Sequence, residues 1–408
     1  MAPILFLVLA VSVFAPASCK HLPVVVPVTK DTATSLYTIP FNDGANLVCD
    51  IGGPLVWSTC TLPSEFPCES DTCGLANAYP VPGCPAAGCG HEVKTCTAYP
   101  YNPVTGACAA GSLVHTRFVA NTTDGNHTVS QVSVKAVSAC GTRELLGSLP
   151  RSATGVVGLA DSRLALPAQV ASSQKVAKTF FLCLSGGGDF GDGVAIFGGG
   201  PFQLPPRPGT DYRQFLDYTP LLTKHDNPAH YVSVKHIELE NSIVPLPPRA
   251  LATGGVVLST TVPYTLLRAD VYRPFLAGFR KAMPAVWQNA REVKPVAPFG
   301  LCYDLGTLIA LRSGLDVPSV TLALDGGKNW TMLGDNSMVR LEDQKTACLA
   351  FVQADGVKAG DGKAPAVIVG GFQMENFLLQ FDLEKKQLGF FRLEFFEHCG
   401  SFDFSRRG

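Results

Sequence analysis

The sequence predicts an all-β protein made of two similar β lobes with a central cleft between them and few short helices. Its 40 glycines and 31 prolines among 408 residues favour many short strands joined by turns. A pattern of apolar strand, polar residue and turn occurs at 47–57 and again at 254–264. A short apolar run that ends in glycine lies within 155–160, and a second lies within 366–372. Two lobes of the same order leave a cleft, with one loop from each lobe at its floor.

Composition sets the size and the class of partner. With 46% apolar residues the chain can bury a large core, which indicates about two domains. The segment 201–212 carries four prolines and is the best linker, so we predict an N-terminal lobe at 20–205 and a C-terminal lobe at 206–408. A net charge of −1 gives no electrostatic reason to expect nucleic acid or an anionic membrane as partner. We expect a monomer.

The first 19 residues predict a secretory signal. An apolar run from Ile4 to Phe14 is too short to span a bilayer, and the small residues Ala15 to Cys19 follow it. We place cleavage after Cys19, with the Ala17–Ser18 bond as the alternative. The mature protein would then be secreted and extracellular.

The N-terminal half reads as strands around one Cys-rich excursion. Prolines and Gly83 exclude a long helix from residues 58–98, and residues 98–106 read as a proline-rich hairpin. Strands are expected at 24–28, 35–41, 179–184 and 194–199, and a helix at 164–176.

The second half repeats this order. We expect strands at 231–234 and 236–239, a helix at 268–282 and a hairpin at 377–390 with a polar turn.

Asp50 and Ser259 hold the same place in the two repeated loops. Asp50 ends an apolar strand and precedes two glycines, so its carboxyl faces a cleft rather than bulk water. A carboxylate is costly to bury, so a buried one usually either forms structural hydrogen bonds or takes part in a reaction. A serine hydroxyl in the second loop cannot take the part of a second carboxyl as a general acid.

Cysteine usage agrees with secretion. Of 14 cysteines, 13 remain after Cys19 is removed, and a disulfide-stapled excursion fits eight of them better than a zinc site does. Cys-x4-Cys pairs occur without a nearby pair of histidines, so we expect no metal and no cofactor. Cys49 lies on the strand before Asp50, where a free buried thiol packs well, and we predict it unpaired. The eight crowded cysteines are Cys60, Cys68, Cys73, Cys84, Cys89, Cys96, Cys108 and Cys140.

Three Asn-x-Thr sequons are candidate glycosylation sites on a secreted surface, at Asn121, Asn126 and Asn329.

The loop pair resembles the two active-site loops of the pepsin-like aspartic proteases. In that family two carboxyls share a proton and activate one water. Here Asp50-Ile51-Gly52 keeps one carboxyl and Ser259-Thr260-Thr261 keeps none, which implies an inactive dyad. Tyr101 lies where the family has the tyrosine of its flap, although Asn102 and Pro103 depart from the motif and also suit a plain proline-rich hairpin.

Longer runs resemble the cereal TAXI-type xylanase inhibitors. They include 27–30, 35–41, 55–60, 75–80 and 97–103. The resemblance implies a plant apoplastic defence protein that inhibits microbial xylanases of glycoside hydrolase family 11. It also implies the disulfides Cys183–Cys399 and Cys302–Cys348.

The inhibitory His and Leu of that group fall at about Phe395 and Arg312, and His398 lies three residues after Phe395. The resemblance therefore points to Phe395, His398 and Arg312 as target-binding residues, within 394–404 and 305–315, although neither original residue type is kept. Two alternatives stay open: a divergent aspartic endopeptidase that uses Asp50, and a storage or carbohydrate-sensing globulin on the same scaffold.

Overall fold

A computed structural model describes residues 21–42, 44–60, 64–81, 83–89, 94–394 and 396–405. The predicted signal at 1–19 therefore lies outside the described residues. The described chain is mostly β with few helices, as the sequence predicts. Among the described residues, no helix is long and apolar enough to cross a membrane.

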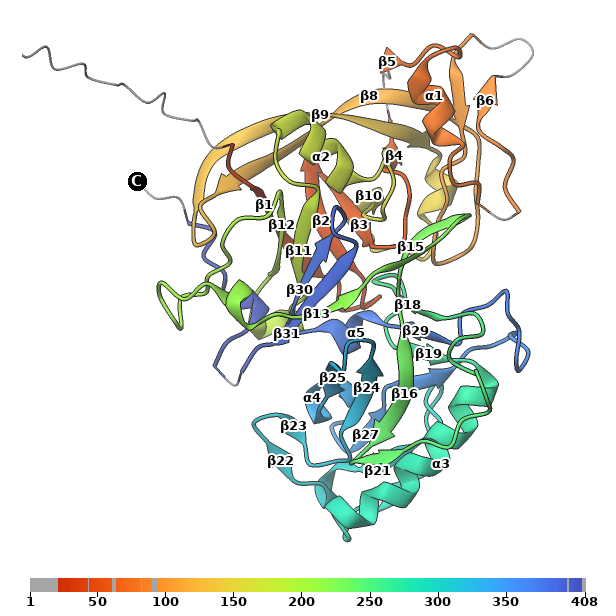
Figure 1. The fold of residues 1–408 in the computed structure, drawn as a ribbon, viewed down its shortest axis with the longest axis vertical. Coiled ribbons are helices and arrows are strands. Elements are labelled where there is room, and N and C mark those ends of the chain that lie inside the picture. Colours follow the sequence, from red (N-terminus) through yellow and green to blue (C-terminus); the bar gives the residue numbers. More distant parts are fainter. Residues whose placement is uncertain are drawn as a thin grey trace, which may run out of the picture.

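One large sheet dominates the upper part of the molecule in Figure 1. Its strand order is β13-β31-β30-β11-β12-β1-β2-β3-β10-β4-β9-β8-β7-β6, with β5 paired to β8. Strands from both predicted lobes thus share one sheet, because the β30–β31 hairpin pairs with β11. The strands of this sheet are β1 (Val24–Lys30), β2 (Tyr37–Asn42), β3 (Ala45–Asp50), β4 (Trp57–Thr59), β5 (Ser64–Glu65), β6 (Gly88–Cys89), β7 (Cys96–Ala98), β8 (Gly111–Thr123), β9 (Thr128–Gly141), β10 (Ala153–Gly158), β11 (Thr179–Cys183), β12 (Gly193–Phe197), β13 (Asp217–Pro220), β30 (Phe377–Asp382) and β31 (Gln387–Arg392).

Smaller sheets and the longest helix make up the lower part (Figure 1). The six-stranded sheet comprises β14 (Leu222–Lys224), β15 (Asn227–Val232), β18 (Val256–Leu258), β29 (Val367–Val369), β19 (Thr265–Leu267) and β28 (Phe351–Gln353). The remaining sheets comprise β17 (Ser242–Ile243), β16 (Val234–Leu239), β24 (Val320–Leu324) and β25 (Asn329–Met332); β20 (Glu292–Val293), β21 (Cys302–Asp304), β27 (Thr346–Leu349) and β26 (Met338–Arg340); and β22 (Ala310–Leu311) with β23 (Gly314–Leu315).

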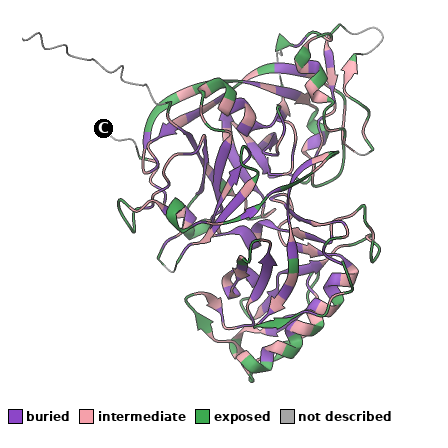
Figure 2. Ribbon diagram, in the orientation of Figure 1, coloured by how far each residue is buried: buried purple, intermediate pink, exposed green. Residues whose placement is uncertain are grey.

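The helices are short except for one. They are α1 (Asp71–Ala76), α2 (Leu166–Gln174), α3 (Ala269–Val286), α4 (Gly334–Ser337) and α5 (Gly371–Met374). Helix α3 buries Val271, Phe275, Phe279 and Met283, one residue per turn, which is the spacing of an amphipathic helix. It runs four residues beyond the predicted end at 282 because Met283 continues this apolar row. Figure 2 shows buried strands at the centre of both parts and exposed residues on the outer face of α3.

A parallel neighbouring strand supports the strand that leads into each of the two repeated loops. Strand β10 runs parallel to β3, so that Gly158 lies opposite Asp50, and β29 runs parallel to β18 in the same way. A side chain at Gly158 would lie 2.3 Å from the carbonyl oxygen of Gly53, so glycine is required at this crossing. The two predicted apolar segments that end in glycine thus lie directly behind the two loops.

Candidate functional site

Asp50 ends a buried strand and is held by its own turn. Its Oδ1 atom accepts a hydrogen bond from the backbone N–H of Gly52 at 2.9 Å, and Gly53 N–H donates to the carbonyl of Asp50 at 3.1 Å. The residue is only 9% exposed. The turn therefore presents the carboxyl at the end of a strand with little contact with water.

Ser259 has the same local geometry in the second loop. It follows β18 directly, and its Oγ atom accepts a hydrogen bond from the backbone N–H of Thr261 at 3.2 Å. The Thr261 hydroxyl lies 3.0 Å from the same oxygen. Ser259 is therefore the structural counterpart of Asp50.

Thr260 joins the two loops. Its buried hydroxyl donates to the carbonyl oxygen of Cys49 at 2.5 Å and accepts from the N–H of Ile51 at 3.2 Å. These contacts span about half the chain and hold the two loops together. The sequence paired the loops, but nothing in it singled out Thr260 as the connecting residue.

Burial controls the acidity of this site. Desolvation raises the pKa of Asp50 to about 6, and the backbone N–H groups of Gly52 and Gly53 oppose that rise. Burial also raises the pKa of the Cys49 thiol far above its usual range, so this cysteine is not a nucleophile. Asp50 is thus a single carboxyl that changes protonation in mildly acidic solution.

A pocket opens directly above Asp50. It has an empty volume of about 670 Å³, and among the described residues that line it Asp50 is the one acidic group. Trp57 forms part of its wall and donates its indole N–H to the carbonyl of Tyr101 at 2.8 Å. The opposite wall comes from the Cys-rich excursion, with Leu75 and Tyr79 among its residues.

Asn102 explains the departure from the flap motif. Its side-chain amide donates to the carbonyls of Leu145 and Gly147, and its oxygen accepts from the N–H groups of Val104 and Thr105. The residue is fully buried. Asn102 therefore anchors this turn to the body of the protein.

Two of the predicted target-binding residues lie beside exposed aromatic rings. The guanidinium of Arg312 lies 5.3 Å from the ring centre of Phe396, whose exposed fraction is 71%. The ring of His398 lies 5.5 Å from that of Phe190, which is also exposed. Phe395 lies outside the described residues. The structure thus brings the loop at 305–315 into contact with the C-terminal segment at 394–404.

The C-terminal segment is tied down at two points. A disulfide joins Cys183 to Cys399, and the buried carboxylate of Glu397 pairs with Arg207 at 2.5 Å. These ties fix the backbone on both sides of His398.

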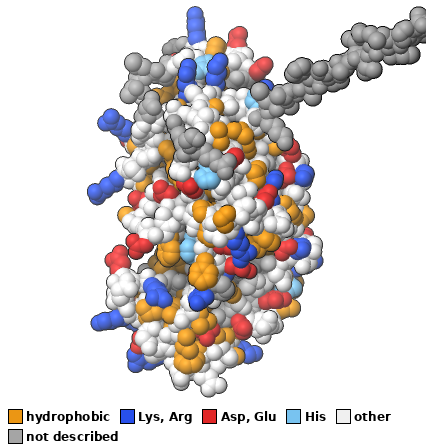
Figure 3. Space-filling view, turned by 90° about the vertical axis from the view of Figure 1, so that its left-hand side faces the viewer, with side chains coloured by type: hydrophobic (Ala, Val, Ile, Leu, Met, Phe, Trp, Pro, Cys, Tyr) orange, Lys and Arg blue, Asp and Glu red, His pale blue; other side chains and the backbone are white. Residues whose placement is uncertain are grey.

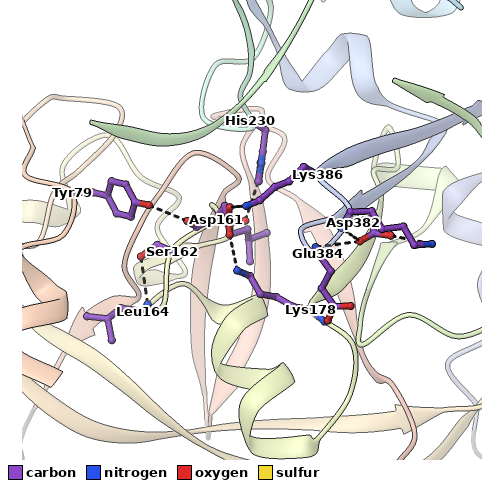
Figure 4. Close-up of polar contacts among 11 residues, drawn as sticks. Tyr79, Asp161, Ser162, Leu164, Lys178, His230, Asp382, Glu384 and Lys386 are labelled. Atoms are coloured by element: carbon purple, nitrogen blue, oxygen red, sulfur yellow. Dashed lines mark hydrogen bonds and ion pairs between the residues drawn. The ribbon is translucent and has the colours of Figure 1, made fainter. Parts of the chain in front are cut away.

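A second polar cluster, not anticipated from the sequence, lies after β10 (Figure 4). Lys178 and Lys386 both point toward Asp161 and form ion pairs with it, the first at 2.7 Å. Nearby, the buried ring of His230 contacts the carbonyl of Leu159 at 3.1 Å, and desolvation lowers the pKa of His230 to about 4. The cluster joins segments from both halves of the chain and has the character of structural support.

The described cysteines form six disulfides and leave Cys49 unpaired and buried. The pairs include the two that the resemblance implied, and they are Cys60–Cys140, Cys68–Cys89, Cys73–Cys96, Cys84–Cys108, Cys183–Cys399 and Cys302–Cys348. Among the described residues no group of histidines, cysteines and acids is arranged to hold a metal ion. Of the sequon asparagines, Asn329 is exposed, while Asn121 and Asn126 are half-buried.

Figure 3 shows one face of the molecule, where positive and negative side chains are interspersed with apolar ones. This mixed surface matches the net charge of −1.

Comparison with known proteins gives matches along nearly the whole chain. A family model described as xylanase inhibitor N-terminal matches residues 37–199, and one described as xylanase inhibitor C-terminal matches residues 229–392.

Three similar proteins span the chain. A protein of Oryza sativa subsp. japonica named Chitinase CLP is 46% identical over 393 residues, covering 94% of this chain and 92% of that protein. The Probable aspartic proteinase GIP2 of Nicotiana benthamiana is 30% identical, covering 93% and 92%. The crystal structure of basic 7S globulin from soybean superposes with a TM-score of 0.76 at 28% identity, covering 93% of this chain and 98% of that one.

Proposed function

The chain belongs to the xylanase inhibitor family, and from this premise we propose that it is a secreted inhibitor of a microbial cell-wall-degrading endo-xylanase. In this proposal the target is an enzyme of glycoside hydrolase family 11, the inhibitor acts in the plant apoplast in defence, and it has no proteolytic activity. Its two β lobes, divided near residue 205, enclose a central cleft with the Asp50 and Ser259 loops at its floor. The signal at 1–19 directs secretion, and the three sequon asparagines carry glycans.

The observation that carries the proposal is the contact between Arg312 and Phe396. It supports a composite surface in which the loop at 305–315 and the C-terminal segment act together. An exposed aromatic ring held by a cation suits the centre of a protein–protein interface, where aromatic and arginine side chains carry most of the binding energy.

The target supplies complementary groups. Glycosidases keep a pair of carboxyls in their active sites, to which Arg312 offers a cation and His398 a ring nitrogen for a hydrogen bond.

Loss of proteolysis follows from Ser259. An aspartic protease needs two carboxyls that share a proton, and Ser259 holds the second position with the same hydrogen bond to its turn. Its hydroxyl does not share a proton with Asp50 at mildly acidic pH. This supports a chain in which the protease site is retained as structure.

A panel of hydrolases tests the inhibitor proposal. The secreted protein is incubated with xylanases of family 11 and endoglucanases of family 12, and residual activity is titrated against inhibitor concentration. Stoichiometric inhibition of a xylanase is expected. Failure against the whole panel at micromolar concentrations contradicts the proposal and favours a globulin without a hydrolase target.

Single variants test the surface. We expect Arg312→Ala, His398→Ala and Phe395→Ala each to weaken inhibition about tenfold or more, as loss of an interface anchor does. Arg143→Ala, at an exposed arginine in the N-terminal half, is the matched control and should inhibit like wild type. Wild-type inhibition by all three surface variants would place the contact elsewhere.

Chitin hydrolysis is a second candidate because of the 46% identity with the rice protein named Chitinase CLP. Glycosidases that act through two carboxyls hold them about 5 to 10 Å apart. Asp50 has no acidic neighbour among the described residues of its pocket, which weighs against this activity. Release of soluble sugar from colloidal chitin by wild type but not by Asp50→Asn would establish it.

A casein digest at acidic pH tests the divergent endopeptidase. We expect no cleavage, and no effect of a statine-containing peptide inhibitor. Restoring the carboxyl alone with Ser259→Asp should not give activity, because Ile51 and Thr261 also depart from the family motif.

A further inference from the structure

The most exposed apolar side chains gather beside the C-terminal segment. Among the described residues, the large apolar side chains that are exposed by half or more are Phe396, Ile243, Phe190 and Leu311. Three of them lie close to that segment. Phe396 belongs to it, Leu311 directly precedes Arg312, which contacts the Phe396 ring, and Phe190 contacts His398. Such a concentration marks an interaction surface rather than the scattered apolar residues that any surface has.

The contacts order four side chains into a row. At one end the guanidinium of Arg312 lies 5.3 Å from the ring centre of Phe396. At the other end the ring centres of His398 and Phe190 lie 5.5 Å apart. Phe396 and His398 flank the buried Glu397, and their Cα atoms are at most roughly 7 Å apart. The row therefore begins in the C-terminal half of the chain and ends in the N-terminal half, at Phe190.

The loop at 185–191, which carries Phe190, is fixed against the C-terminal segment. A side chain at Gly400 would lie 1.6 Å from the carbonyl oxygen of Phe190, so the two backbones are in direct contact. The disulfide Cys183–Cys399 joins the strand before the loop to the residue before Gly400. Within the loop, the hydroxyl of Ser185 donates to the carbonyl of Phe190 at 3.3 Å. An exposed ring on a fixed backbone loses little freedom when a partner binds it.

Packing within the protein does not explain the position of this ring. Phe190 is 55% exposed, so it contributes little buried area to the fold. Its ring contact is with His398, which is itself only half-buried. Aromatic and arginine side chains grouped in this way are typical of the centre of a protein–protein interface.

We propose that Phe190 is a further target-binding residue, which packs directly against the target beside His398. This inference rests on the proposed inhibition of a xylanase and adds to it a contact from the N-terminal half of the chain. The target then meets a row in which the rings of Phe396 and Phe190 alternate with the polar groups of Arg312 and His398. Flat aromatic rings suit a cleft that is shaped to hold the rings of a polysaccharide.

Inhibition constants against a family 11 xylanase test this contact. Phe190→Ala should weaken inhibition about tenfold or more, as loss of an interface anchor does. Phe190→Tyr keeps the ring and should inhibit nearly like wild type. Ile243→Ala removes a side chain of greater exposure from β17, outside the row, and is the matched control that should inhibit like wild type.

A double-mutant cycle separates direct contact with the target from support of His398. In the His398→Ala background, Phe190→Ala should still weaken inhibition severalfold or more. No further loss in that background would show that Phe190 only positions His398, and this would overturn the proposed contact. The thermal unfolding of each variant is recorded. Phe190→Leu, which loses the flat ring but keeps most of the apolar volume, replaces Phe190→Ala if that variant does not fold, and it should also weaken inhibition.

Failure of this inference is distinguishable from failure of the proposed function. A wild-type protein that inhibits no xylanase contradicts the proposed function and this inference with it. Wild-type inhibition that Phe190→Ala or Phe190→Leu leaves unchanged overturns the inference alone. Equal losses in Phe190→Ala and Ile243→Ala would also overturn it, because any exposed apolar side chain would then have the same effect.

Discussion

At the scale of single residues, two buried titratable groups affect stability in opposite directions. Asp50 is held with a pKa of about 6 and His230 with a pKa of about 4, and desolvation is the main cause of both shifts. Both groups are thus pushed toward their neutral forms. Their effects overlap between pH 4 and pH 6, so the wild-type protein shows only their difference.

Asp50→Asn should stabilise the protein at neutral pH. The folded pKa of Asp50 lies above its unfolded value of 3.8, so stability is lost as the pH rises through 6. Asparagine removes the ionisation and still accepts from Gly52. The free energy of unfolding should rise by up to about 3 kcal/mol at pH 7 and change little at pH 4. Urea denaturation at both pH values checks this, and an equal change at both would contradict it.

His230→Gln should flatten the loss of stability in acid. The buried ring lies beside the stacked pair Phe180 and Phe381, near Asp161 and Lys386. Its folded pKa lies below the unfolded value of 6.5. Stability is therefore lost as the pH falls from 6.5 toward 4, by roughly 3 kcal/mol. Glutamine keeps a donor for the carbonyl of Leu159. The free energy of unfolding of the variant, relative to that of wild type, should therefore rise by that amount when the pH is lowered from 7 to 4. Denaturant titration at both pH values checks this.

The sequence indicated Asp50 and Ser259 but not His230. A carboxyl between an apolar strand and two glycines is visible in the local pattern, and its repeat two hundred residues later marks the pair. His230 has no local signal, because its burial depends on Phe180 and Phe381 from distant strands. The same holds for Glu375, which accepts hydrogen bonds from Lys30 and Tyr37, both at 2.6 Å. Such contacts require the tertiary fold.

At the scale of elements, the contact between the two loops is the feature that orders the site. The two loops have the same support: β3 pairs in parallel with β10, and β18 pairs in parallel with β29. The pattern predicted these strands because each is short, apolar and ends in glycine or a turn. The register of these strands and the contact between the loops could not be predicted. The sequence around a threonine in a Ser-Thr-Thr run does not indicate which distant backbone group its hydroxyl will bond.

Thr260→Val should weaken this contact. Valine has the same shape but leaves the carbonyl of Cys49 and the N–H of Ile51 without their buried partner. We expect a loss of roughly 2 to 4 kcal/mol in the free energy of unfolding, as for two unsatisfied buried groups. Thr260→Ser retains the hydroxyl and is the control, with a smaller loss. Equal losses in the two variants would contradict a dominant role for the two hydrogen bonds, because serine keeps the hydroxyl that forms them.

At the scale of the whole molecule, the number of free thiols can be measured directly. Six disulfides leave Cys49 unpaired among the described residues, and Cys19 falls in the predicted signal. The secreted protein, denatured without reductant, should react with thiol reagent at one site. A result of zero or three thiols would contradict the pairing. Peptide mapping after alkylation should identify Cys49, and the native protein should react slowly because this thiol is buried.

The shared fifteen-stranded sheet has a consequence for how the chain is made. Strand β11 pairs on one side with β12 and on the other with β30, about 200 residues later. When a ribosome has released only the first half of the chain, β11 has a bare edge of unpaired backbone groups, which invites pairing with other chains. Cys183 likewise stays unpaired until Cys399, 216 residues later, has been synthesised. The nascent first half is thus the aggregation-prone stage of biogenesis, and a fragment that stops at residue 205 is unsuited to expression by itself.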